Sequence, residues 1–119
     1  MANEELSRTD QQLRKRLDEA DVLFQVGQQL RKDLDEPDLV LPPVGDEAFE
    51  RLRTEVKARL ELWQRSGSAS LARAINRVDL TEAQVNKALE MGGLHQLAGA
   101  MVFRCLQKVL LRERYAGRL

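Results

Sequence analysis

The sequence holds few of the residues that stabilise β-folds or small secreted proteins. Its single cysteine, Cys105, cannot form an internal disulfide, so the chain is not a disulfide-stabilised secreted scaffold. Aromatic residues make up 4% of the chain and β-branched residues number 13 of 119, which argues against a β-sandwich or a β-barrel. All three prolines fall between Pro37 and Pro43, so most of the chain lacks the strongest helix breaker.

Residues that carry catalysis or hold metals are also scarce. His95 and Cys105 stand ten residues apart on one expected helix, which separates them by about 15 Å along its axis, too far for a nucleophile and its base. No Cys-x-x-Cys or His-x-x-x-His spacing offers a metal site, and no glycine-rich phosphate loop is present. We therefore expect no catalytic residues, no cofactor, no metal and no small-molecule substrate.

Long hydrophobic runs are missing as well. The longest apolar run, Leu97–Phe103, has seven residues, whereas a membrane-spanning helix needs about 20. The first residues, Met1–Glu5, are polar and acidic and lack the apolar region of a signal peptide. We therefore expect a soluble, cytoplasmic protein without a membrane partner.

Leucine and charged residues dominate instead. Leucine occurs 20 times, and hydrophobic residues make up 43% of the chain, which is enough to form the core of one domain. Because leucine favours helices and strand formers are rare, we predict an all-α, single-domain helical bundle of about five helices over residues 1–119.

The first third of the chain predicts a long amphipathic helix over residues 3–36. Its apolar residues recur at steps of mostly three, four and seven, with charged residues opposite. A straight helix of this length would extend about 51 Å, further than a globule of this size can cover. Gly27 is a candidate kink. Pro37 ends the helix, and the prolines that follow predict an extended strap over residues 37–45 that lies against a surface.

Residues 46–119 are expected to form the helical core. A helix from Asp46 to Arg65 has Asp46 as its expected N-cap. Its apolar face consists of Phe49, Leu52, Val56, Leu60 and Trp63. A short helix over residues 70–76 follows.

Two further helices are separated by Gly92–Gly93. Thr81 and Gln84 fit a capping box and predict a helix start, and the glycine pair predicts its end. The last helix, over residues 94–115, is apolar on most sides, as expected for a helix surrounded by others. It also carries basic residues every four positions, which we call the basic ridge: Arg104, Lys108 and Arg112.

The first helix is the expected partner surface, because a helix this long followed by an apolar strap needs more buried surface than a short chain supplies. The leading interpretation is a non-enzymatic structural or regulatory protein–protein interaction module that associates with itself or joins a larger assembly. The open alternative is a helix that folds back and completes a monomeric bundle. The expected interface residues are Leu13, Leu17, Phe24, Leu30 and Leu34.

The alternative function is DNA binding by a helix pair over residues 70–91. Two short helices separated by a break resemble the general helix-turn-helix pattern. The break lacks the usual glycine, and Glu82 and Glu90 on the second helix would repel phosphate. The residues considered for base or phosphate contacts are Arg73, Arg77, Gln84, Asn86 and Lys87, together with the basic ridge.

The net charge of zero conceals an asymmetry along the chain. Residues 1–64 hold 15 acidic and 10 basic side chains, whereas residues 65–119 hold 4 acidic and 9 basic ones. The asymmetry predicts either that the two halves attract each other, within the fold or in a dimer, or that the second half meets an acidic or nucleic-acid partner.

Overall fold

Five α-helices and one short 3-10 helix form the structure, a computed structural model that describes residues 8–116. The elements are α1 (Arg8–Lys15), the 3-10 helix η2 (Arg16–Asp18), α2 (Ala20–Leu34), α3 (Ala48–Ser66), α4 (Ser70–Val78) and α5 (Glu82–Ala116). No strand occurs in this part of the chain. The prediction of an all-α globule of about five helices is therefore confirmed.

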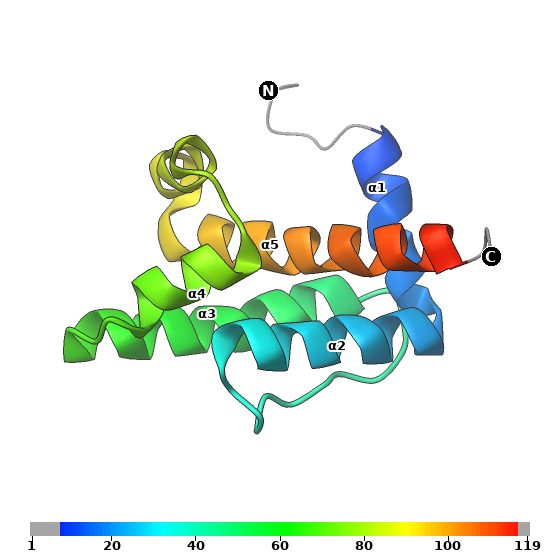
Figure 1. The fold of residues 1–119 in the computed structure, drawn as a ribbon, viewed down its shortest axis with the longest axis horizontal. Helices are drawn as coiled ribbons and strands as arrows, with labels where there is room; N and C mark the ends of the chain where they lie inside the picture. Colours follow the sequence, from blue (N-terminus) through cyan, green and yellow to red (C-terminus); the bar gives the residue numbers. More distant parts are fainter. Residues whose placement is uncertain (1–7, 117–119) are drawn as a thin grey trace.

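The body of the molecule consists of α2, α3 and the second half of α5, and α5 lies against each of the other two (Figure 1). The second half of α5 packs against both α2 and α3, and this explains why it is apolar on most sides. Its fully buried residues include Met101, Val102, Leu106 and Val109. Over residues 8–116, no helix combines the length and the apolar character that crossing a bilayer requires.

The single long helix expected over residues 3–36 is wrong. The chain forms α1, η2 and α2 instead, and Glu19 takes an extended conformation (φ −91°, ψ 126°) between the last two; residues 3–7 lie outside the described part. A straight helix would need about 51 Å, whereas the longest dimension of the molecule is 43 Å. The turn at Glu19 places Leu17 in the core, where it is 1% exposed. Its burial outweighs the local helix preference.

Gly27 and the proline-containing segment pack against each other. Gly27 does not kink α2, which continues through it. Leu41 lies so close that a Cβ at Gly27 would stand 2.6 Å from the Leu41 Cγ. Leu39 is fully buried. Backbone hydrogen bonds from Leu39 to Glu36 and from Ala48 to Gly45 close turns at both ends of the segment, so a continuous extended strap over residues 37–45 is not confirmed.

The helix α3 confirms the second expected helix and its buried face, from Phe49 to Trp63. The expected cap is wrong, because Glu47 and not Asp46 holds the N-cap position, and it makes no side-chain cap hydrogen bond. The helix α4 runs to Val78, two residues beyond its expected end. Asp79 ends it in the left-handed conformation (φ 74°) that glycine usually supplies.

The expected helix start at Thr81 and the expected end at Gly92–Gly93 are both confirmed. The Thr81 N–H donates to Gln84 Oε1 at 2.9 Å, and the Gln84 N–H donates to Thr81 Oγ1 at 3.1 Å, which is a reciprocal capping box. Both glycines leave the helical conformation, the second with φ 65°. Residues 82–91, which we call the arm, therefore project away from the body (Figure 1).

Candidate functional site

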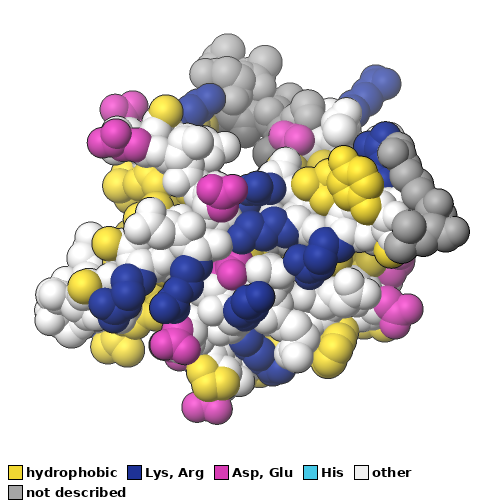
Figure 2. Space-filling view, viewed as in Figure 1, with side chains coloured by type: hydrophobic (Ala, Val, Ile, Leu, Met, Phe, Trp, Pro, Cys, Tyr) yellow, Lys and Arg dark blue, Asp and Glu magenta, His cyan; other side chains and the backbone are white. Residues whose placement is uncertain are grey.

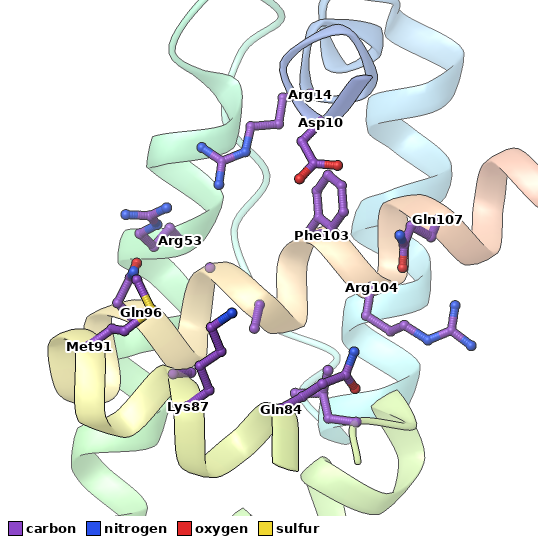
Figure 3. Close-up of a pocket in the computed structure, with 14 residues that line it drawn as sticks. Asp10, Arg14, Arg53, Gln84, Lys87, Met91, Gln96, Phe103, Arg104 and Gln107 are labelled. Atoms are coloured by element: carbon purple, nitrogen blue, oxygen red, sulfur yellow. The ribbon is translucent and has the colours of Figure 1, made fainter. Parts of the chain in front are cut away.

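A hollow lies between α1 and the arm, over the middle of α5. α1 and the arm stand at opposite ends of the second half of α5 (Figure 1), and the space between them measures about 380 Å³. Figure 3 shows side chains from α1, α3 and both halves of α5 around it. The charged residues that line the hollow are Asp10, Arg14, Arg53, Lys87 and Arg104, and Gly99, Ala100 and Phe103 of α5 also line it.

Contacts at helix ends position the two walls of the hollow. Arg16 of η2 ties the α1 end to α5, because its Nε lies 2.7 Å from Glu19 Oε2 and its Nη2 lies 2.8 Å from Glu113 Oε1. Hydrogen bonds to Glu19 and then to Glu113 raise the pKa of Arg16 above its ordinary value. The capping box at Thr81 and the glycine kink orient the arm. The hollow is therefore defined by how the helices begin and end.

The guanidinium groups of Arg14 and Arg53 form the cationic wall. Arg14 reaches from α1 toward Arg53 on α3 (Figure 3). The Cζ atoms of Arg14 and Arg53 lie 3.8 and 5.4 Å from the centre of the Phe49 ring, so one aromatic ring supports both cations. Glu50 Oε2 is 4.0 Å from Arg14 Nη1, and Glu50 Oε1 is 3.6 Å from Arg53 Nη1. The two cations thus approach the same exposed acid, and the charge of Asp10 also acts on Arg14.

Arg53 is more buried than an arginine usually is, with 8% of its surface exposed. Its Nη1 lies 2.6 Å from His95 Nε2. Because a guanidinium can only donate, the His95 nitrogen accepts this hydrogen bond. On its other side Arg53 lies against Gly99, where a Cβ would stand 2.8 Å from the Arg53 Nε. The absence of a side chain at Gly99 therefore makes room for the guanidinium.

The two arginines are incompletely paired. The Nε atoms of Arg14 and Arg53 are shielded from water and have no hydrogen-bond partner within residues 8–116, and an unsatisfied buried donor costs about 1–3 kcal/mol. Burial lowers the pKa of Arg14, and the positive charge of Arg53 lowers it further. Lys87 on the opposite wall makes no ion pair within the described residues. The hollow therefore offers positive charge, while these two Nε donors stay inside the fold.

An apolar groove adjoins the hollow. Its volume is about 490 Å³. Leu13 of α1 and Leu110 and Leu111 of α5 form its apolar lining, and the charged residues that also line it are Arg16, Arg104, Glu113 and Arg114. Arg104 and Gln107 line both the hollow and the groove. Figure 2 shows apolar side chains beside a band of Lys and Arg side chains on this face. The hollow and the groove thus form one surface, and the three leucines give its groove end an apolar strip beside charged side chains.

The residues expected at the partner interface are divided in the structure. Leu17, Leu30 and Leu34 belong to the chain's own hydrophobic core. A side chain in the core cannot also form a docking surface, so this part of the expected interface is corrected. Leu13 is partly buried and lines the groove, whereas Phe24 is 57% exposed on α2.

The arm does not gather its candidate base-reading residues on one face. Gln84 and Lys87 line the hollow. Asn86 is exposed, four residues from both Glu82 and Glu90, so it lies on the same helix face as these two acids. A nucleic acid that approached Asn86 would therefore meet two negative charges.

The basic ridge is engaged within the fold, and it brings α4 and α5 together. Arg73 and Arg77 are exposed on α4, and the Arg77 carbonyl accepts a hydrogen bond from the ridge. The ridge residues have these partners: Asp79 for Arg104 at 3.1 Å, Asp33 and the Arg77 carbonyl for Lys108 at 2.9 and 2.8 Å, and Gln29 for Arg112 at 2.8 Å. Much of the ridge charge is thus used to hold helices together.

The thiol of Cys105 lies in a buried polar cluster next to this ridge. Its Sγ is 3.6 Å from Asp33 Oδ2, which also accepts from Lys108 and Gln29. Burial, and then the charge of Asp33, raise the pKa of the Cys105 thiol well above its ordinary value. A protonated thiol is a poor nucleophile. No group of three or more His, Cys, Asp or Glu side chains within residues 8–116 is placed to hold a metal ion.

Arg14 and Arg53 are the candidate functional residues that the sequence analysis missed. Arg53 stands four residues after Phe49 and three before Val56, so the helical period assigns it to the buried face of α3. An arginine at a core position is rare unless it is paired. That mismatch is the sequence signal that could have identified it.

No protein-family model, no curated protein and no solved structure matches this chain significantly.

Proposed function

We propose that this protein is a non-enzymatic protein–protein interaction module that binds an acidic, amphipathic segment of a partner protein across the hollow and the groove. The supporting observation is that the two features are continuous through Arg104 and Gln107. A segment with acidic side chains toward the hollow and apolar ones toward the groove complements both. The regulatory or structural role and the cytoplasmic location expected from the sequence are part of this proposal.

The groove supplies the apolar part of the proposed interaction. Leu111 is 45% exposed, and Leu13 and Leu110 pack partly against the core beside it. Side chains that are already held by the core lose little freedom on binding, which reduces the entropic cost of association. An apolar residue of the partner would thus find a shaped, ordered surface.

DNA binding receives less support from the geometry. Asn86 lies on a face with Glu82 and Glu90, and Arg104 and Lys108 already pair with acids of the chain. Fewer cations are left to release counterions from a duplex. We therefore treat duplex binding as an outcome that the experiment can reveal.

The test is a fluorescence anisotropy series with three labelled probes. The first is an amphipathic peptide that carries glutamates and leucines, the second has every glutamate replaced by glutamine, and the third is a DNA duplex of about 20 base pairs. We expect the acidic peptide to bind with a Kd of about 1–100 μM and the glutamine peptide at least about tenfold more weakly. Equal affinity for both peptides would refute the proposal.

Two leucine variants test whether the groove takes part. Leu111→Asp places a carboxylate in the groove and should weaken peptide binding at least about tenfold. Leu62→Asp is the matched control, because Leu62 is similarly exposed (50%) but lies on α3 and does not line the groove. Equal effects of the two variants would contradict the assignment of the groove.

Light scattering with and without the peptide shows whether another molecule, such as a second copy of the chain, occupies this surface. A dimer that the peptide dissociates would identify a second copy of the chain as the natural occupant of the surface. Duplex binding that is stronger than peptide binding and falls steeply with salt would favour the DNA alternative. A monomer that binds only the acidic peptide is the result we expect.

A further inference from the structure

We infer that Arg14 and Arg53, opposite Lys87, form a binding site for a single carboxylate group in the hollow. The inference rests on the proposed function for the source of the carboxylate, which would be the partner segment. The site itself is argued from the geometry of this chain. It therefore makes predictions that can fail separately from those of the proposed function.

Arg14 and Arg53 have N–H donors that the described part of the chain does not use. A guanidinium carries five N–H groups and accepts nothing. The Nη1 of Arg53 faces His95 and Glu50, but its Nη2 has no hydrogen bond within residues 8–116. Arg14 has the 4.0 Å approach to Glu50. Because charged groups taken out of water normally find paired acceptors, these spare donors favour an acceptor supplied from outside.

The two guanidinium groups are also held in place by their neighbours. Arg14 stacks on the Phe49 ring, and Arg53 is fixed between His95, Gly99 and that same ring. A guanidinium that is already oriented loses little freedom when it binds a carboxylate. The low exposure of Arg53 also removes competing water, which strengthens a charge-assisted hydrogen bond.

The charges of the hollow favour a carboxylate over a phosphate. Arg104 is neutralised by Asp79. The remaining cations are Arg14, Arg53 and Lys87, and the acids at the site are Asp10 and Glu50. Because the acids of the chain already offset part of this positive charge, a singly charged carboxylate suits the site better than a phosphate monoester, which carries about −1.5 to −2 charges at neutral pH.

The test follows the arginine Nε–Hε signals by NMR during a titration with sodium propionate, which presents one carboxylate. We expect the signals of Arg14 and Arg53 to shift and saturate with a Kd of about 1–20 mM. Arg112 lies outside the hollow and is the internal reference. Inorganic phosphate at the same ionic strength should bind more weakly. Unchanged Arg14 and Arg53 signals, or equal shifts at Arg112, would overturn the inference.

Variants then assign the binding to these side chains. Arg14→Gln and Lys87→Gln should each weaken propionate binding at least about threefold, while Arg112→Gln, which removes the same charge, should leave it unchanged. Arg53→Gln should abolish binding. Because Arg53 is buried and its loss can unfold the chain, Gly99→Ala is a second variant. It keeps every charge but places a methyl group against the Arg53 guanidinium, and it should also weaken binding. Retained binding in Lys87→Gln and Gly99→Ala together would contradict the site.

Two peptides distinguish the sources of the carboxylate. One carries a single glutamate and an amidated C-terminus, and the other carries glutamine and a free C-terminal carboxylate. Competition with propionate by the first assigns an acidic side chain, and competition by the second assigns a chain terminus. If the acidic amphipathic peptide binds equally well to Arg14→Gln and wild type, the carboxylate site is wrong although the proposed function stands. If propionate saturates the site but no peptide binds, the proposed function is wrong although the site stands.

Discussion

The buried pair of Asp33 and Lys108 should be one of the main links between α2 and α5. Asp33 Oδ2 lies 2.9 Å from Lys108 Nζ. The same carboxylate accepts hydrogen bonds from the Gln29 side chain at 3.0 Å and from the Cys105 thiol at 3.6 Å. We predict that removing either charge lowers the free energy of unfolding. Removing both charges should lower it by less than the sum of the two single losses.

The expected magnitude follows from how deeply each partner is buried. The Asp33 side chain is 6% exposed and the Lys108 side chain is 18% exposed. Breaking a buried pair typically costs about 3–5 kcal/mol. Without Asp33, Lys108 keeps some water contact and its hydrogen bond to the Arg77 carbonyl at 2.8 Å. We therefore expect Asp33→Ala to lower the free energy of unfolding by about 2–4 kcal/mol. Lys108→Met should cost a similar amount, because it leaves a buried carboxylate with weaker donors.

The assay is urea unfolding followed by circular dichroism for wild type, both single variants and the double variant. A loss of about 3 kcal/mol moves the midpoint by about 1–3 M urea for a domain of this size. The double variant should show a coupling energy of about 1–3 kcal/mol. Arg104→Met is the control, because Asp79 in that pair is 74% exposed and the loss should stay below about 1 kcal/mol. If the effects of the two single variants add, Asp33 and Lys108 do not stabilise each other, which would refute the prediction. Lys108 would then be available to a ligand.

Three further predictions concern single features of the fold. Thr81→Ala should lower the free energy of unfolding by about 1 kcal/mol, because it removes the acceptor of the Gln84 N–H; an unchanged urea midpoint would contradict the capping box. Leu17→Asp should unfold the chain, since Leu17 is buried, while Phe24→Asp should leave the circular dichroism spectrum and melting temperature nearly unchanged; equal effects would contradict the placement of α2. Because the pKa of the Cys105 thiol is raised in the folded state, the thiol should contribute stability below about pH 8.5 that is lost at higher pH, where only the unfolded chain ionises it. Cys105→Ala should remove that part of the pH dependence, which urea unfolding between about pH 7 and 10 would measure.

Local signals in the sequence predicted the elements whose boundaries are set by nearby residues. The capping box at Thr81, the glycine pair at 92–93 and the periodic face of α3 all appear as expected. Each depends on groups within about one or two helical turns, so the pattern contains the information that decides the structure. The all-α class follows from composition in the same way.

The features that the sequence analysis missed depend on contacts between distant residues. The break at Glu19 contains neither glycine nor proline, and it is accompanied by the contact of Arg16 with Glu113, 97 positions away. Arg53 is buried next to His95, which stands 42 positions later. A helical period can show that Arg53 faces inward, but only the packed helices show that Gly99 makes room for it. The candidate site is therefore formed by tertiary contacts. The sequence indicates it only through an arginine at a position where the helical period predicts a buried side chain.

The charge asymmetry of the sequence connects the fold to the proposed partner. The pair of Asp33 and Lys108 joins the acidic first half to the basic second half, as expected if the halves attract each other. The pair of Arg16 and Glu113 joins them with the opposite polarity, and Arg104 pairs with Asp79 within the second half. Ion pairs between the two halves therefore account for only part of the charge asymmetry. Within the described residues Lys87 stays without an ion pair, and it faces a hollow where two further cations approach the same exposed acid. Opposite charges at an interface guide two proteins toward each other and select partners. The incompletely paired positive charge of the hollow is therefore what an acidic segment would recognise.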